Sequence, residues 1–129
     1  DVHIRLVMYR GLADANNEES LRDLQVEMID RFGLLPEQIK NLFRVTQIKL
    51  NAEEIGITKL EANNRGGKVE FASDTRVDPL LIVKLVQSQP RIYKLEGANQ
   101  LKFAMDLDTT EKRIQAVTDL LTYLNPKIN

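Results

Sequence analysis

The chain has 129 residues, of which 43% are hydrophobic and 29% are charged, and its formal net charge is −1. This composition is typical of a folded globular protein, and the length fits a single domain over residues 1–129. The near-neutral charge argues against a module whose main task is to coat nucleic acid, because such modules need a basic surplus to displace counterions from phosphates.

Two features that the sequence lacks bear on the cellular location of the protein. The chain contains no cysteine, which excludes disulfides and thiolate sites and favours a reducing, cytoplasmic location. It also has no apolar run near the ~20 residues of a membrane span, so no membrane partner is expected. Because the chain begins at Asp1 without an initiator methionine, we interpret it as a piece cut from a longer protein.

The first half of the chain is predicted to form three helices, over about residues 2–15, 18–32 and 36–54. The second is strongly amphipathic, because its apolar side chains fall on one narrow arc: Leu21, Leu24, Met28 and Phe32. Gly33 stands where a residue with positive φ usually ends a helix, and Pro36 suits the first turn of the next one. Apolar residues surround most of the third helix, so we expect it to be buried on more than one side.

The second half alternates between strands and helices. Ile57–Asn63 and a returning strand with Val69 and Phe71 predict a hairpin, with Arg65-Gly66-Gly67 as its turn. A short, almost wholly apolar helix, Leu80–Val86, is expected to be buried. A second strand pair follows over residues 91–95 and 100–105.

A last helix is predicted to begin near Thr109, with its apolar residues on one face. The element order therefore predicts an α+β fold, in which a three-helix segment precedes a small antiparallel sheet built from two strand pairs and two further helices.

No constellation of residues indicates catalysis. His3 is the single histidine, and no cysteines accompany it, so no zinc site is predicted. The Arg65–Lys68 stretch lacks the spacing of a phosphate-binding loop and lies between two strands. We therefore expect a domain that is not an enzyme, with no catalytic residue, no metal, no cofactor and no small-molecule substrate of its own.

Four acids lie along the polar side of the second helix. Glu19, Asp23, Glu27 and Asp30 recur at spacings of four, four and three, which places them within about 80° of one another, opposite the apolar arc. An ordinary solvated face would explain this strip. The alternative is a docking strip for a basic partner, in which complementary charge supplies specificity and association rate.

The run from Val26 to Pro36, VEMIDRFGLLP, resembles a hallmark stretch of one family. That family is the C-terminal domain of the bacterial transcription-repair coupling factor, Mfd. The similarity extends over nearly the whole chain, through Gly66-Gly67 and Val69–Ala72 to Leu101-Lys102-Phe103. The resemblance implies a regulatory module at the end of a large ATP-dependent DNA translocase that acts on stalled RNA polymerase and recruits UvrA.

In that family the domain is understood to dock on an N-terminal UvrB-like module of the same protein and to mask the UvrA-binding surface until polymerase is engaged. The resemblance implies that Glu27, Asp30 and Arg31 make polar contacts of this clamp. Glu19 and Asp23 lie outside the matched motif, and their role as partner-binding residues depends on the helical spacing alone.

Two other functions stay open. The domain could contact DNA behind the motor through basic residues of the third helix and first strand, namely Lys40, Arg44, Lys49 and Lys59. It could also be a structural end-domain of the translocase without a gating role. On either reading RNA polymerase, UvrA and DNA are partners of the parent protein, and ATP is a cofactor of the parent alone.

Overall fold

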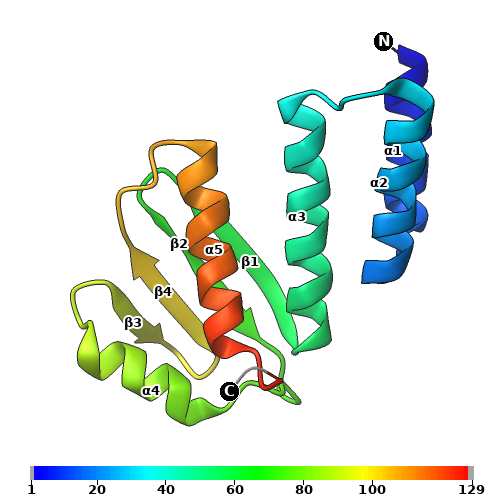
Figure 1. Cartoon of the computed structure of the whole chain (residues 1–129). Coiled ribbons are helices and arrows are strands. Elements are labelled where there is room, and N and C mark those ends of the chain that lie inside the picture. Colours follow the sequence, from blue (N-terminus) through cyan, green and yellow to red (C-terminus); the bar gives the residue numbers. More distant parts are fainter. Residues whose placement is uncertain (1, 128–129) are drawn as a thin grey trace. The chain divides into compact units, whose positions relative to one another are not determined.

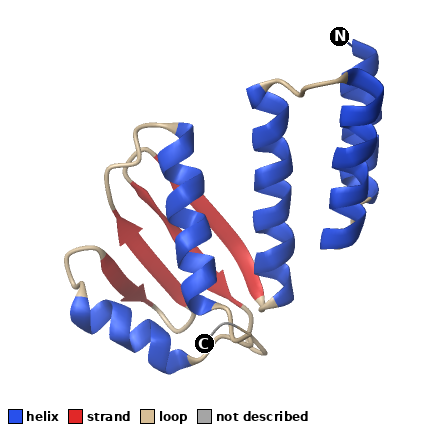
Figure 2. Ribbon diagram, viewed as in Figure 1, coloured by secondary structure: helices blue, strands red, loops and turns tan. Residues whose placement is uncertain are grey.

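The structure is a computed structural model, and it describes residues 2–127. The order of its helices and strands is the predicted one and confirms the α+β class (Figures 1 and 2). The elements are α1 (Val2–Asp14), α2 (Glu18–Phe32), α3 (Glu37–Glu54), β1 (Ile57–Asn63), β2 (Gly66–Phe71), α4 (Pro79–Ser88), β3 (Tyr93–Glu96), β4 (Gln100–Ala104) and α5 (Thr110–Leu124).

The chain divides into two compact units, Asp1–Leu50 and Asn51–Asn129, which we call unit 1 and unit 2. The division falls inside α3, so this helix contributes to both units. The organisation of residues 1–129 as a single domain stays a prediction, which a test of unfolding cooperativity can decide.

Unit 1 is held together by an apolar cluster from three helices. Its buried members are Met8, Leu21, Leu24, Met28, Leu35 and Phe43, and partly buried side chains such as Ile4, Leu12 and Phe32 pack against them. The apolar arc predicted for α2 therefore faces this core. On α3, Phe43 and Ala52 are both buried although they lie about 180° apart around the helix. This agrees with the expected burial on more than one side, while Val45 is 51% exposed.

Unit 2 is built on a four-stranded antiparallel sheet in the order β1-β2-β4-β3. Helix α5 lies across one face of this sheet (Figure 1). Because side chains alternate between the faces of a sheet, Val69, Leu101 and Phe103 all point to the helix-covered face, where they are buried. Helix α5 contributes five buried residues to the core: Ile114, Val117, Leu120, Leu121 and Leu124.

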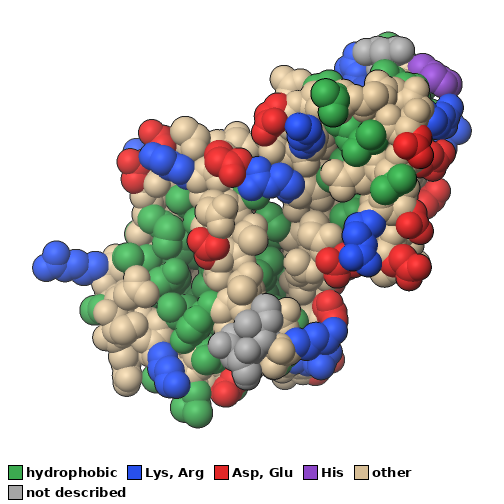
Figure 3. Space-filling view, in the orientation of Figure 1, with side chains coloured by type: hydrophobic (Ala, Val, Ile, Leu, Met, Phe, Trp, Pro, Cys, Tyr) green, Lys and Arg blue, Asp and Glu red, His purple; other side chains and the backbone are tan. Residues whose placement is uncertain are grey.

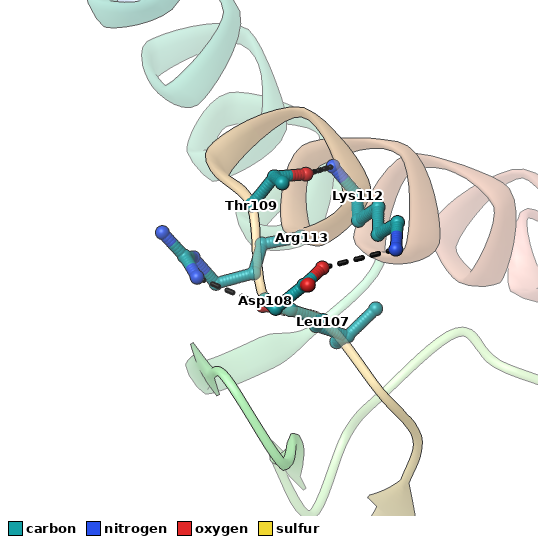
Figure 4. A network of polar contacts seen from close by, with 5 residues as sticks. All are labelled: Leu107, Asp108, Thr109, Lys112 and Arg113. Carbon is teal, nitrogen blue, oxygen red and sulfur yellow. Dashed lines mark hydrogen bonds and ion pairs between the residues drawn. The ribbon is translucent and has the colours of Figure 1, made fainter.

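Polar contacts fix the start of α5 (Figure 4). The backbone N–H of Lys112 donates to Thr109 Oγ1 at 3.1 Å, and Arg113 Nη1 donates to the Leu107 carbonyl at 2.8 Å. The Lys112 ammonium lies 2.9 Å from the Asp108 carboxylate. This contact lowers the pKa of Asp108 and raises the pKa of Lys112. The junction between β4 and α5 is therefore held by side chains as well as by the backbone.

The expectation that the short apolar helix is buried is wrong. In α4 only Leu85 is fully buried, whereas Leu80 is 64% and Val83 39% exposed. The helix packs against β3, an edge strand, and against α5, and the side that carries Leu80 and Val83 is open to solvent. Tyr123 of α5 donates a hydrogen bond to the Leu81 carbonyl at 3.0 Å and helps to hold α4 in place.

The predicted position of the hairpin turn is also wrong, because the turn lies closer to the N-terminus than Arg65-Gly66-Gly67. The turn consists of Asn64 and Arg65, and both glycines belong to β2. Gly66 has φ of 140°, and a Cβ there would lie 2.0 Å from the Phe103 carbonyl oxygen. The two glycines are therefore needed for the close approach of neighbouring strands, and not for the turn itself.

Candidate docking surface

Both ends of α2 are capped, and the caps fix where the helix begins and ends. The side chain of Asn17 accepts a hydrogen bond from the backbone N–H of Ser20 at 2.7 Å. At the other end Gly33 adopts φ of 79°, and its N–H donates to the Ile29 carbonyl at 2.8 Å. With the apolar arc packed in the unit 1 core, the opposite side of α2 faces solvent.

All five predicted partner-binding residues are exposed: Glu19, Asp23, Glu27, Asp30 and Arg31. Their helical positions bring the four acids to one side of α2, and Figure 3 shows acidic side chains gathered over the part of the surface formed by α1 and α2. We call these four acids, Glu19, Asp23, Glu27 and Asp30, the acidic strip. The predicted geometry of the strip is therefore present, while its role stays a prediction.

Arg31 is occupied within its own helix. Its Nη1 lies 3.6 Å from Glu27 Oε1, and its guanidinium carbon lies 5.2 Å from the centre of the Phe32 ring. The side chains of Arg31 and Glu27 are 47% and 57% exposed, and ion pairs this exposed contribute only about 0–1 kcal/mol. Breaking the ion pair between Glu27 and Arg31 to form contacts with a partner protein therefore costs little free energy.

The rest of the strip carries uncompensated charge. Among the described residues, none forms a side-chain hydrogen bond or ion pair with Glu19, Asp23 or Asp30. Like charges three or four residues apart on a helix repel one another by a few tenths of a kcal/mol per pair. The strip thus presents a local negative potential that a basic partner would relieve.

Exposed apolar residues lie beside these acids or just beyond the helix, and the sequence analysis missed them. Val26 is 59% exposed and Ile29 43%, and Leu34, just beyond the helix, is 93% exposed. At about 100° per residue, Val26 lies within about 40° of Glu19 and Asp30 around the helix. Val26 and Ile29 lie outside the apolar arc of α2, and this position in the sequence pattern could have identified them as exposed. The surface of α2 therefore combines charge with apolar area.

The four basic residues considered for DNA contact do not form one face. Lys40 and Lys49 lie about 180° apart around α3 at 100° per residue. Arg44 lies 3.5 Å from the Asn41 side-chain oxygen, and Lys59, on β1, pairs with Glu61 at 3.3 Å. The structure therefore gives no support to a DNA site made of these four residues together.

Over residues 2–127 no group of three or more His, Cys, Asp or Glu side chains is arranged to hold a metal ion. Within the same range no helix combines the length and the apolar character needed to cross a membrane.

These features define an α+β domain whose most distinctive surface is one helix face carrying acids and exposed apolar side chains. Residues 1–82 match the model of the TRCF domain family, and the chain belongs to that family. This confirms the resemblance drawn from the Val26–Pro36 run.

Two curated relatives, each called transcription-repair-coupling factor, extend the match. The one from Escherichia coli (strain K12) is 40% identical over 124 residues, which cover 96% of this chain and 11% of the relative. The one from Haemophilus influenzae is 38% identical over 121 residues, covering 94% and 11%. The chain thus spans about a tenth of the length of these relatives.

One solved structure, described as the C-terminal domain of transcription-repair coupling factor, has the same fold. Its TM-score is 0.67 at 18% sequence identity, and the match covers 91% of this chain and 74% of that one. At this identity the comparison supports the architecture alone.

Proposed function

We propose that this chain is a regulatory docking domain without catalytic activity. It folds back on an N-terminal UvrB-like module of its parent coupling factor and masks the UvrA-binding surface until stalled RNA polymerase is engaged. ATP-dependent translocation on DNA belongs to the parent, in the cytoplasm. The observation that carries the proposal is the solvent-facing side of α2, where carboxylates without partners lie beside exposed apolar side chains.

The composition of this surface suits a reversible clamp. Protein interfaces usually combine an apolar centre with a polar, charged rim. On α2 the apolar centre is Val26, and the rim is Asp30, about 40° from it around the helix, with the Glu27–Arg31 pair farther round on the same side as the acids. Because that pair is exposed and weak, its members can turn to charges on the partner when the domain docks.

Tethering lets such a small surface work. Within one polypeptide the domain meets its target at an effective concentration that can reach the mM range. A contact of about 5 kcal/mol corresponds to a Kd near 0.2 mM, which is enough to keep the site mostly closed under these conditions. The same weakness lets polymerase engagement release the domain.

The test is UvrA binding by the full-length parent protein, with and without Glu27→Lys plus Asp30→Lys. Reversal of two charges in the rim should weaken the clamp by about 1–3 kcal/mol. Because a Kd near 0.2 mM at an effective concentration of about 1 mM closes roughly five-sixths of the molecules, opening the clamp should tighten UvrA binding by up to about sixfold, most of all at low salt. The matched control is Glu53→Lys plus Asp74→Lys, two exposed acids of unit 2, which should leave UvrA binding as it was.

A second variant tests the apolar centre. Val26→Ser removes exposed apolar area without disturbing the unit 1 core, so it should also tighten UvrA binding, but independently of salt. Unchanged UvrA affinity in both α2 variants would sink the proposal. If deletion of the whole domain then lowered the stability of the parent without changing its affinity for UvrA, a structural end-domain would be the better account.

A further inference from the structure

The face of the sheet that α5 leaves uncovered has a row of lysines across three strands. The registers place Lys68 of β2 opposite Lys102 of β4, and Lys102 opposite Lys94 of β3. Glu61 of β1 lies opposite Lys68 at the end of this row. We call Lys68, Lys102 and Lys94 the lysine row.

This arrangement is unfavourable for the isolated domain. Like charges directly opposite one another on neighbouring strands are destabilising. The same face offers partial compensation, because Lys102 pairs with Glu96, Lys59 pairs with Glu61, and Glu70 accepts a hydrogen bond from Gln100. Lys68 and Lys94 form no side-chain hydrogen bond or ion pair with any residue between 2 and 127. Among the described residues, two of the three lysines are therefore in no ion pair, and Glu61, opposite Lys68, is paired with Lys59 instead.

A shallow hollow lies at one end of the lysine row. The strand positions beyond the row carry small residues, Gly66 and Ala104, which are opposite one another. Around the resulting hollow of about 280 Å³ are Arg65, Lys68 and Lys102, together with Glu61 and Asn63. Since a water molecule in the liquid occupies about 30 Å³, a phosphate group with several waters fits in this space.

The chemistry of this face distinguishes between possible partners. Its strand positions carry Lys, Glu, Gln, Asn, Gly and Ala, and none carries a large apolar side chain. Leu95, which is 51% exposed, lies opposite Leu101 on the other face of the sheet. Protein–protein interfaces need an apolar centre, whereas nucleic-acid interfaces are more polar and more basic. A polyanion with phosphates spaced along it is therefore the better fit.

We propose that the uncovered face of the sheet binds the phosphate backbone of a nucleic acid. Arg65, Lys68 and Lys102 hold one phosphate at the hollow, and Lys94 contacts the backbone farther along the row. The binding is independent of base sequence, since phosphate contacts carry no sequence information. This surface shares no residue with the acidic strip, so its failure would leave the docking proposal untouched.

The experiment titrates the full 129-residue chain with a labelled mixed-sequence oligonucleotide, single-stranded and as a duplex, over a series of salt concentrations. We expect a Kd on the order of 10–100 μM near 50 mM salt, as for other sequence-independent binders. Lys68→Gln plus Lys94→Gln should weaken binding by about tenfold or more and reduce the slope of log K against log salt by about two.

A matched variant and a mapping experiment control for overall charge. Lys40→Gln plus Lys84→Gln removes the same charge from exposed positions on α3 and α4, and should leave the affinity nearly unchanged. In amide NMR spectra the oligonucleotide should shift Gly66, Lys68 and Lys102 more than residues of α2.

Three results would overturn the proposal. The first is no binding by the unmodified chain below about 1 mM at low salt, well outside the range of sequence-independent binders. The second is equal loss of binding in both double variants. The third is tighter binding of a poly-glutamate peptide than of the oligonucleotide, with the same dependence on Lys68 and Lys94, which would identify the partner as an acidic protein segment.

Discussion

Tyr93 is the residue of the sheet whose ionisation the fold changes most clearly. It is buried on β3, and its ring centre lies 6.4 Å from that of Phe103. Burial raises the pKa of Tyr93 above its ordinary value of 10.0, and the carboxylate of Asp119 raises it further. A raised pKa in the folded state contributes stability that is fully present below the unfolded value and is lost as pH rises through the folded one.

We therefore predict that Tyr93→Phe removes part of the alkaline loss of stability. In the unmodified chain the free energy of unfolding should fall above about pH 10, because the unfolded chain ionises this tyrosine more readily. Urea unfolding followed from pH 8 to 11 measures the effect. The control is Tyr9→Phe, an exposed tyrosine of unit 1 whose replacement leaves Tyr93 in place. Identical alkaline limbs for the Tyr93→Phe variant and the unmodified chain would contradict the prediction.

For single residues, the sequence predicts the side of a helix on which a side chain lies better than it predicts the neighbours that the side chain contacts. Spacing places the acids of α2 on one side, because angles around a regular helix follow from residue numbers alone. It does not reveal that Val26 and Ile29 stay exposed, since that depends on which neighbours the tertiary fold supplies. Nor does it reveal that Arg31 pairs with Glu27 in the free domain, because side-chain rotamers decide that contact.

Among the elements, α5 depends on a single capping side chain. Thr109 Oγ1 accepts from the Lys112 N–H, one of the donors that has no partner within the helix. Thr109→Ala should cost about 1 kcal/mol of unfolding free energy, which chemical denaturation can measure. The control is Thr118→Ala, an exposed position inside the same helix, where alanine should be neutral or slightly stabilising. An equal loss in both variants would show that the cap contributes nothing specific.

Helices and strands are predicted well where the local sequence pattern is strong. The prediction fails where a contact with an element distant in sequence determines the burial or the position of a residue. The amphipathic pattern of α2 and the apolar face of α5 are properties of the segments themselves, and both helices form as expected. The burial of α4 was overestimated because an apolar helix on an edge strand has a neighbour on one side only. The hairpin turn was misplaced because Gly66 is required by the backbone of β4, which is distant in sequence.

For the whole molecule the open question is whether the two units unfold together. Helix α3 passes without a break through the division between Leu50 and Asn51. We predict one cooperative transition, because loss of unit 1 would leave α3 without most of its packed length. Met28→Ala, a change at a fully buried position, should lower the unfolding free energy by about 2–5 kcal/mol.

Amide hydrogen exchange measures the extent of this coupling. If the prediction holds, the slowest-exchanging amides of β2 and β4 in unit 2 lose as much protection as those of α2. The control is Leu34→Ala, which removes a side chain that is 93% exposed and should change little. Loss of protection in unit 1 alone would show that the chain consists of two independently folding parts.

The fold class and the family could be inferred from the sequence because the signals for both lie within the chain. The proposed docking partner was implied by the family resemblance alone, because the chain spans about a tenth of its relatives' length and the spacing of residues along α2 carries no information about a surface outside the chain. The lysine row was invisible for a related reason. Lys68, Lys94 and Lys102 are spread over 35 positions of the chain, and only the strand registers bring them together.

The mixture of acids and apolar side chains on α2 also affects how copies of this domain behave toward one another. Val26, Ile29 and Leu34 would form a surface prone to self-association if they stood alone. Because the same helix face carries Glu19, Asp23 and Asp30, a second copy approaching it meets its own charge. We therefore expect repulsion between these acids to limit self-association of the domain. The apolar residues stay accessible to a surface of opposite charge.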